Sequence, residues 1–92
     1  MSFPSVDLLR ETHAFPGRYL FKAVGLTSEF RNRVEHAVRE EVGKDRELAV
    51  STRSSASGRH TAVSIEAVVS SPEQVVAVYR RLAAIEGLTL LL

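Results

Sequence analysis

The chain has 92 residues, of which 45% are hydrophobic and 25% are charged, and this length and composition are typical of one globular domain with one core. It contains no cysteine, which excludes disulfide bonds and thiolate metal sites. Twelve basic and eleven acidic residues give a net charge of +1, so no overall electrostatic field favours DNA, RNA or an anionic membrane.

The amino-terminal segment, residues 1–16, is predicted to be a lead-in to a single domain over residues 17–92. A short helix from Ser5 to Thr12 is expected within it, and Pro16-Gly17 ends it. The helix would turn three apolar side chains toward the domain: Val6, Leu8 and Leu9. Because the sequence shows no secretion signal and no apolar run of bilayer length, we expect a cytoplasmic protein without membrane contact.

The stretch RYLFKAVGL, residues 18–26, alternates between two faces and predicts the first strand. The two sets of side chains are Tyr19, Phe21 and Ala23 on one face and Leu20, Lys22 and Val24 on the other. A helix is expected next, with Thr27 or Ser28 as its N-cap and Gly43 as its end. Its apolar stripe repeats at every fourth residue: Phe30, Val34, Val38 and Val42.

Two further strands are predicted from the alternation in ELAVSTRS, residues 47–54, and in AVSIEAVV, residues 62–69. In the latter, one face carries Val63, Ile65, Ala67 and Val69, and the other carries Ala62, Ser64, Glu66 and Val68. SPEQ at residues 71–74 then indicates a helix start, because Ser71 can cap, Pro72 suits the first helical position and Gln74 completes a capping box. Gly87 ends this helix, and LTLLL at residues 88–92 is predicted to be a fourth strand.

The order strand, helix, strand, strand, helix, strand predicts an α+β, ferredoxin-like βαββαβ sandwich. Right-handed crossovers leave a gap between strands one and two, and strand three fills it. The sheet is therefore expected to be antiparallel in the order 4-1-3-2, with both helices on one face and the other face uncovered. The residues expected to be buried together are Tyr19, Phe21, Val34, Val38, Val63, Ile65, Val75, Val78 and Leu82.

The run SSASGR, residues 54–59, has the small residues of a phosphate-binding loop, but its context differs from one. A phosphate-binding loop follows a strand and opens a helix, so that several backbone N–H groups converge on the anion. Here the run joins two predicted strands. A hairpin turn is therefore the favoured interpretation.

Residues over most of the chain from Phe15 onward resemble the YbeD-like family of small bacterial proteins of unknown function. The resemblance is carried by Phe15-Pro16, Lys22, Gly25, SSASGRHTAVSI at residues 54–65, EQV at residues 73–75 and Tyr79. That family looks like ACT-type regulatory domains, which implies a ferredoxin-like fold and a ligand-binding or adaptor role. Where ACT-type domains usually carry an Asp and a Pro-Gly pair after strand one, this chain has AVGLTSEF.

Several classes of function are disfavoured by missing residues. An acylphosphatase, an enzyme with this fold, needs an Arg after strand one and an Asn on strand two, and the chain has neither, so no catalytic residue is assigned. His13, His36 and His60 fall on three different elements, so neither a metal site nor another cofactor is expected. The uncovered face lacks the aromatic residues on which RNA-binding sheets stack bases, which argues against nucleic acid as a partner.

Two candidate sites are predicted. The hairpin end should approach the start of helix one, and its N–H groups, hydroxyls and cations would suit a small carboxylate or phosphate, unless the hydroxyls merely cap the helix and the arginines are solvated. The residues concerned are Gly25, Thr27, Ser28, Arg53, Arg59 and His60. The uncovered face is the candidate surface for a protein partner, with Leu20, Lys22, Val24, Ser64 and Glu66, and Lys22 is expected to pair with Glu66 across the strands.

The sequence therefore favours a non-enzymatic regulatory or adaptor domain that acts through an unidentified protein partner. The alternative is an ACT-like sensor of a small anionic metabolite at the hairpin end. Any homodimer is expected to form through a sheet edge or the uncovered face and not through the helices. The fourth strand is the favoured edge, since unpaired edge groups can bind another chain and LTLLL has neither charge nor proline to prevent this.

Overall fold

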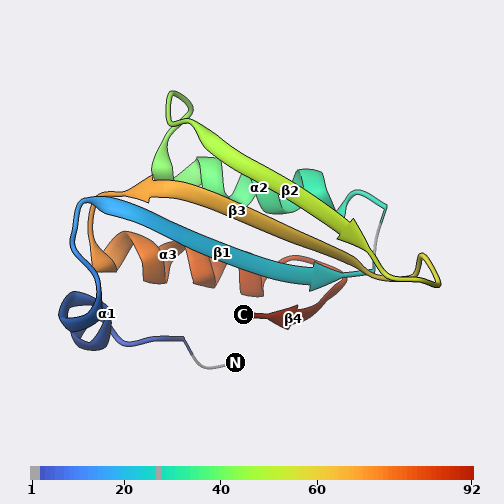
Figure 1. Ribbon diagram of the computed structural model, residues 1–92, viewed down its shortest axis with the longest axis horizontal. Coiled ribbons are helices and arrows are strands. Elements are labelled where there is room, and N and C mark those ends of the chain that lie inside the picture. The colour runs from blue at the N-terminus through green and yellow to red at the C-terminus, as the bar shows by residue number, and fades with distance from the viewer. Residues whose placement is uncertain (1–2, 27) are drawn as a thin grey trace.

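The computed structural model describes residues 3–26 and 28–92 (Figure 1). The elements in chain order are α1 (Val6–Thr12), β1 (Gly17–Gly25), α2 (Phe30–Val42), β2 (Leu48–Ser54), β3 (Thr61–Val69), α3 (Pro72–Ala83) and β4 (Leu88–Leu91). The structure is thus an α+β arrangement of a four-stranded sheet with three helices. The short amino-terminal helix α1 lies outside the alternation of strands and helices and packs against α3.

The sheet is antiparallel throughout, in the order β2-β3-β1-β4, which is 4-1-3-2 when counted from the opposite edge. β1 and β3 form its centre and pair along their whole length, from Gly17 opposite Val69 to Gly25 opposite Thr61. The edge strand β4 is short, and its register with β1 shifts between Val24 and Gly25. Both β2 and β4 therefore leave one side of their backbone unpaired within the sheet.

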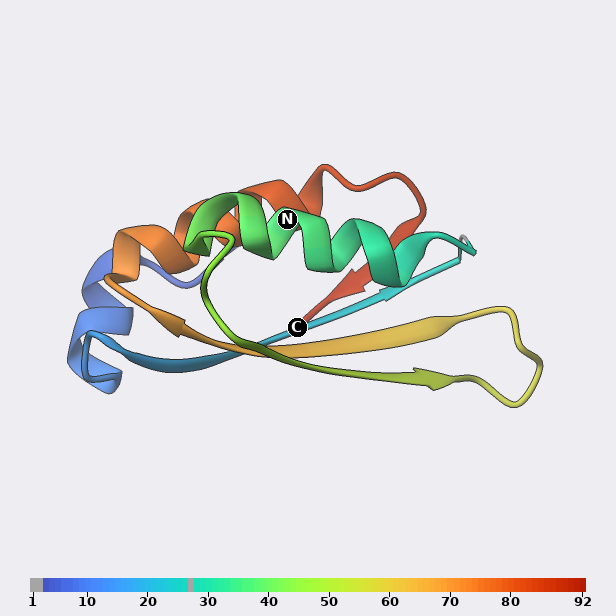
Figure 2. The same ribbon diagram turned by 90° about the horizontal axis from the view of Figure 1, so that it is seen from above.

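Both long helices cover the same face of the sheet, and Figure 2 shows the opposite face without a covering layer. The core lies between the sheet and these two helices. Eight of the nine side chains expected there are buried, whereas Tyr19 is only partly buried at its margin. The period-two pattern of β3 explains the division: Val63, Ile65, Ala67 and Val69 are buried, and the residues between them are half-buried on the open face.

The start of α2 differs from the expectation. Ser28 does not cap the helix, because the helical turn begins later, at Phe30, with Glu29 as an N-cap that makes no side-chain capping bond. Thr27, the other expected cap, lies outside the described residues. Phe30 is fully buried, and its ring lies so close to Gly25 that a Cβ atom there would overlap the ring carbons. The ring of Phe30 thus packs against β1 at the first residue of this helix.

The start of α3 follows the predicted pattern with a shift of one residue. Ser71 Oγ accepts a hydrogen bond from Gln74 N at 3.2 Å, and Pro72 occupies the first turn. Gln74 Oε1 accepts from the N–H of Ser70 at 2.8 Å and not from that of the cap residue. Gln74 Nε2 donates to the carbonyl of Glu41 at 3.0 Å, which ties the start of α3 to the last turn of α2.

A cluster of aromatic residues joins the amino-terminal segment to the core. Phe3 stacks on Tyr79 with ring centroids 5.8 Å apart, and the hydroxyls of Tyr19 and Tyr79 share a hydrogen bond at 3.1 Å. Tyr79 Oη also donates to the carbonyl of Leu92 at 3.4 Å. Burial, and to a lesser degree the bond to Tyr19, raises the pKa of Tyr79 well above its usual value near 10. The neutral phenol is thus the form that the fold requires.

The contact between Gly25 and Phe30 predicts that Gly25→Ala destabilises the protein by about 1–3 kcal/mol, because a methyl group would have to displace the ring. In a Phe30→Leu background the smaller side chain leaves room, so the cost of Gly25→Ala should fall by about 0.5 kcal/mol or more. Urea denaturation of the four proteins in this cycle measures both effects. An equal cost in both backgrounds would show that the overlap is not its origin.

The raised pKa of Tyr79 predicts alkaline sensitivity. A phenol whose pKa is higher in the folded than in the unfolded state contributes stability below the unfolded pKa near 10, and this contribution is lost as the pH rises toward the folded pKa. Tyr79→Phe should therefore lose less stability than the parent between pH 9 and pH 11, as measured by urea denaturation. Tyr19→Phe is the control: burial, the larger cause, remains, so most of the alkaline loss should persist. Equal slopes for the parent and Tyr79→Phe would contradict this account.

Candidate functional site

The Ser/Gly run is a closed hairpin turn. Ser55 N donates to the carbonyl of His60 and Gly58 N donates to the carbonyl of Ser55, both at 2.9 Å. Ser55 Oγ accepts from His60 N at 3.2 Å, and Gly58 takes the positive φ of 74° that the turn needs. The N–H and hydroxyl groups of the run thus bond largely to one another. The turn does not present a ring of free donors to a phosphate.

The described residues of the predicted hairpin-end site lie on different elements and on both faces of the sheet. Gly25 is buried beneath Phe30 on the helix side of the sheet. Arg53 lies opposite Ala62, and its side chain belongs to the open face. Arg59 and His60 are exposed on the hairpin, which extends beyond the end of the sheet in Figure 2. Ser28 is exposed in the connection before α2, and Thr27 lies outside the described residues.

The open face brings together the residues predicted for partner contact, but with a different ion pair. Leu20 lies opposite Glu66 and Lys22 lies opposite Ser64, so the expected Lys22–Glu66 pair is wrong. Glu66 lies diagonally from two cations, Arg18 and Lys22, and its Oε1 accepts from Arg18 Nη1 at 2.9 Å. Lys22 is left without a carboxylate partner in the part of the chain that the structure describes.

Exposed leucines gather where β1 meets β4. The exposed fractions are 56% for Leu20, 48% for Leu90 and 57% for Leu92. Leu90 lies directly opposite Val24, which is half-buried, and Leu92 N donates to the carbonyl of Lys22 at 2.9 Å, so the chain continues along β1 to its last residue. Leu20, Val24, Leu90 and Leu92 together are called the leucine patch. It borders the unpaired edge of β4.

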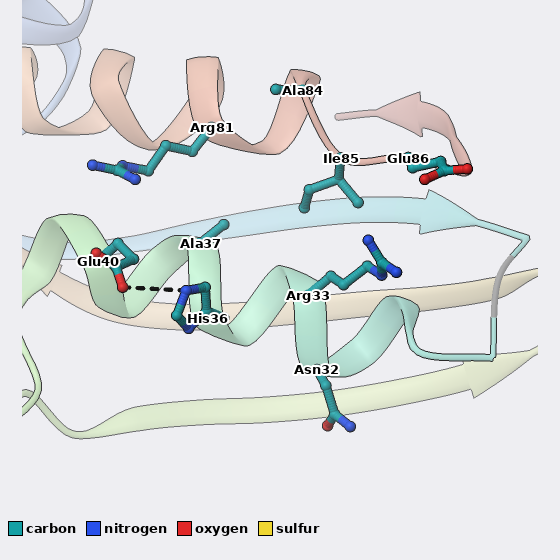
Figure 3. Close-up of a pocket in the computed structure, with 9 residues that line it drawn as sticks. All are labelled: Asn32, Arg33, His36, Ala37, Glu40, Arg81, Ala84, Ile85 and Glu86. Atoms are coloured by element: carbon teal, nitrogen blue, oxygen red, sulfur yellow. Dashed lines mark ion pairs between the residues drawn. The ribbon is translucent and has the colours of Figure 1, made fainter.

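A groove between α2 and α3 is a surface that the sequence did not predict (Figure 3). Its volume is about 650 Å³, and its floor includes Ala37 and Ile85. Its rim carries charges of both signs, among them Arg33 and Glu86, and His36 Nε2 lies 3.2 Å from Glu40 Oε1. Residues of α2, Arg81 of α3 and the segment that follows α3 form it, so no local motif could have indicated it. The mixed rim favours neither an anion nor a cation.

The described residues contain neither a cluster of metal-ligating side chains nor a membrane-spanning helix. Across residues 3–26 and 28–92, the His, Asp and Glu side chains do not gather in groups of three that could hold a metal ion. The same residues include no helix that is both long and apolar enough to span a bilayer.

Comparison with known proteins gives a fold and a lineage. The solution structure of the protein HP0495 from H. pylori matches with a TM-score of 0.75 over 100% of this chain and 98% of that one, at 10% identity, so it supports the fold alone. A "UPF0250 protein" of Shewanella sediminis (strain HAW-EB3) is 36% identical over 78 residues, which are 84% of this chain and 86% of that protein. Its name assigns no activity.

A family model described as "Protein of unknown function (DUF493)" matches residues 10–92, which include every strand and both long helices. This match and the Shewanella relative confirm the resemblance to YbeD-like proteins that the sequence showed. The chain belongs to the DUF493 family of proteins of unknown function.

Proposed function

We propose that this protein is a non-enzymatic adaptor or regulatory domain of ferredoxin-like type that binds a protein partner through its open sheet face. The observation that carries the proposal is the leucine patch. Single exposed leucines are common on protein surfaces, but a contiguous group is a feature of interaction sites. The open face also keeps a fixed shape, because the hydrogen-bonded ladders of β1 with β3 and β4 hold its backbone.

The composition of the face suits a protein partner. Burying the side chain of one exposed leucine contributes roughly 1.5–3 kcal/mol, so three such side chains could supply the apolar centre of an interface. Lys22 and the Arg18–Glu66 pair lie beside the patch and would form a polar rim. A cytoplasmic location remains part of this proposal, and fractionation of the native cell would check it.

The unpaired edge of β4 offers a second way to associate, with another copy of the chain. Two β4 edges paired antiparallel would join two four-stranded sheets into one, and the leucine patches would then lie on one continuous face. We propose this homodimer as one form of the protein.

Leu20→Ser tests the partner surface. A partner that copurifies from the native cell should bind at least about tenfold more weakly to this variant, because the apolar centre of the contact is lost. Leu8→Ser is the matched control, since Leu8 is exposed to a similar degree, 51%, but lies on α1. The measurement is the affinity of each variant for the purified partner. If Leu20→Ser binds the partner as tightly as the parent protein does, or if both variants lose affinity equally, the assignment of this face is wrong.

Leu90→Lys tests the homodimer. A positive charge at the β4 edge on each copy should repel the other, so the monomer–dimer equilibrium should shift toward monomer by about tenfold or more. Sedimentation velocity over a concentration series measures the shift, with Leu8→Lys as the variant of equal charge on a different surface. A dimer that persists in Leu90→Lys would exclude this edge as the interface.

A further inference from the structure

A second feature of the open face lies beside the leucine patch. A hollow of about 320 Å³ spans β1, β2 and β3. Two short side chains on the central strand, Ala62 and Ser64, form its floor, and longer cationic side chains flank them, Lys22 on β1 and Arg53 on β2. The hollow exists because small residues on β3 lie between long ones on its neighbours.

The charges at this hollow are not balanced. The strand positions of the open face carry three cations, Arg18, Lys22 and Arg53, and one carboxylate, Glu66. Glu66 is bound to Arg18 at 2.9 Å. Among residues 3–26 and 28–92, neither Lys22 nor Arg53 forms an ion pair. Two positive charges therefore line the hollow without a counter-charge.

The register shows how these groups could act together. Ser64 lies directly opposite both Lys22 and Ser51, and Arg53 lies opposite Ala62. Lys22 and Arg53 are thus diagonal to each other across β3. From the spacing of strands and residues in a sheet, their Cα atoms lie about 12 Å apart. This separation leaves room for one compact group between the two charged ends, above the Ser64 hydroxyl.

We propose that this hollow binds a compact anionic group, a phosphate or a carboxylate, between Lys22 and Arg53, with Ser64 and Ser51 as hydroxyl donors. A guanidinium presents a planar fork that matches either anion, and an ammonium adds a point charge. A free small-molecule anion and an acidic side chain of a bound protein present the same chemistry to the hollow. The site shares Arg53 with the predicted hairpin-end site but needs neither Arg59 nor His60, and it does not depend on the leucine patch.

The test is a titration of the full ¹⁵N-labelled chain, followed by backbone amide shifts, with inorganic phosphate, citrate and hexaglutamate, each at an ionic strength held constant with sodium chloride. Saturable shifts are expected at Lys22, Ala62 and Ser64. Lys22→Met and Arg53→Met should each weaken binding about tenfold or more, since each removes a charge-assisted hydrogen bond. Lys22→Arg should retain the affinity for the probe. Arg59→Met, which removes an exposed cation of the adjacent hairpin, should leave that affinity within about twofold of the parent value.

The probes separate the two sources of the anion. Saturation by phosphate or citrate indicates a small-molecule site, and saturation by hexaglutamate alone indicates an acidic side chain of a partner. The proposal is overturned by the absence of saturable shifts with all three probes, by shifts confined to residues 58–60, or by equal weakening in Arg59→Met and the two hollow variants. Leu20→Ser should bind the same probes unchanged, so a failed partner surface and a failed anion site give different results.

Discussion

The contact between the Phe30 ring and Gly25 is the constraint on which the arrangement of the first strand and its helix depends. Gly25 is the last residue of β1, and its lack of a side chain lets the ring lie directly on the strand. The ring is fully buried, so α2 is fixed over the sheet from its first turn. The same contact fills the helix side of the strand exit. A ligand at that point would have to displace an aromatic side chain from the core, whereas the opposite face of the sheet has no covering layer.

The open face follows from burial on one side only. Because side chains in a strand alternate, every residue that β1 or β3 places in the core leaves its neighbours on the uncovered face. On β3 those neighbours include Ala62 and Ser64, which are short, and on β1 they include Lys22, which is long. The hollow between the strands is therefore a consequence of side-chain size at positions that the core does not constrain. Stability does not explain two unpaired cations there, since exposed charges of like sign do not strengthen a sheet.

The sequence was informative where a short-range pattern decides the structure. Alternation predicted the faces of β1 and β3, and the repeat of Phe30, Val34, Val38 and Val42 predicted the buried stripe of α2. The prediction that required a choice between two possible ion-pair partners was wrong. Glu66 lies diagonally from both Arg18 and Lys22, and only the side-chain geometry shows that Arg18 is its partner. Ser28 does not cap α2, whose N-cap is Glu29, and the contact of the Phe30 ring with Gly25 joins two elements, so no local pattern could have shown it.

Two hollows of the molecule, the groove beside α2 and the hollow between Lys22 and Arg53, differ in what they can select. The groove beside α2 is the larger of the two, but its rim carries both acids and bases, and Glu40 already lies 3.2 Å from His36 Nε2. Such a rim distinguishes poorly between ligands of opposite sign. The hollow between Lys22 and Arg53 is smaller, yet neither cation has an ion-pair partner among the described residues, so the anion site that we propose there would select its ligand by charge. In this proposal selectivity depends on the imbalance of charge more than on volume, and the binding surface is the face that the helices leave uncovered.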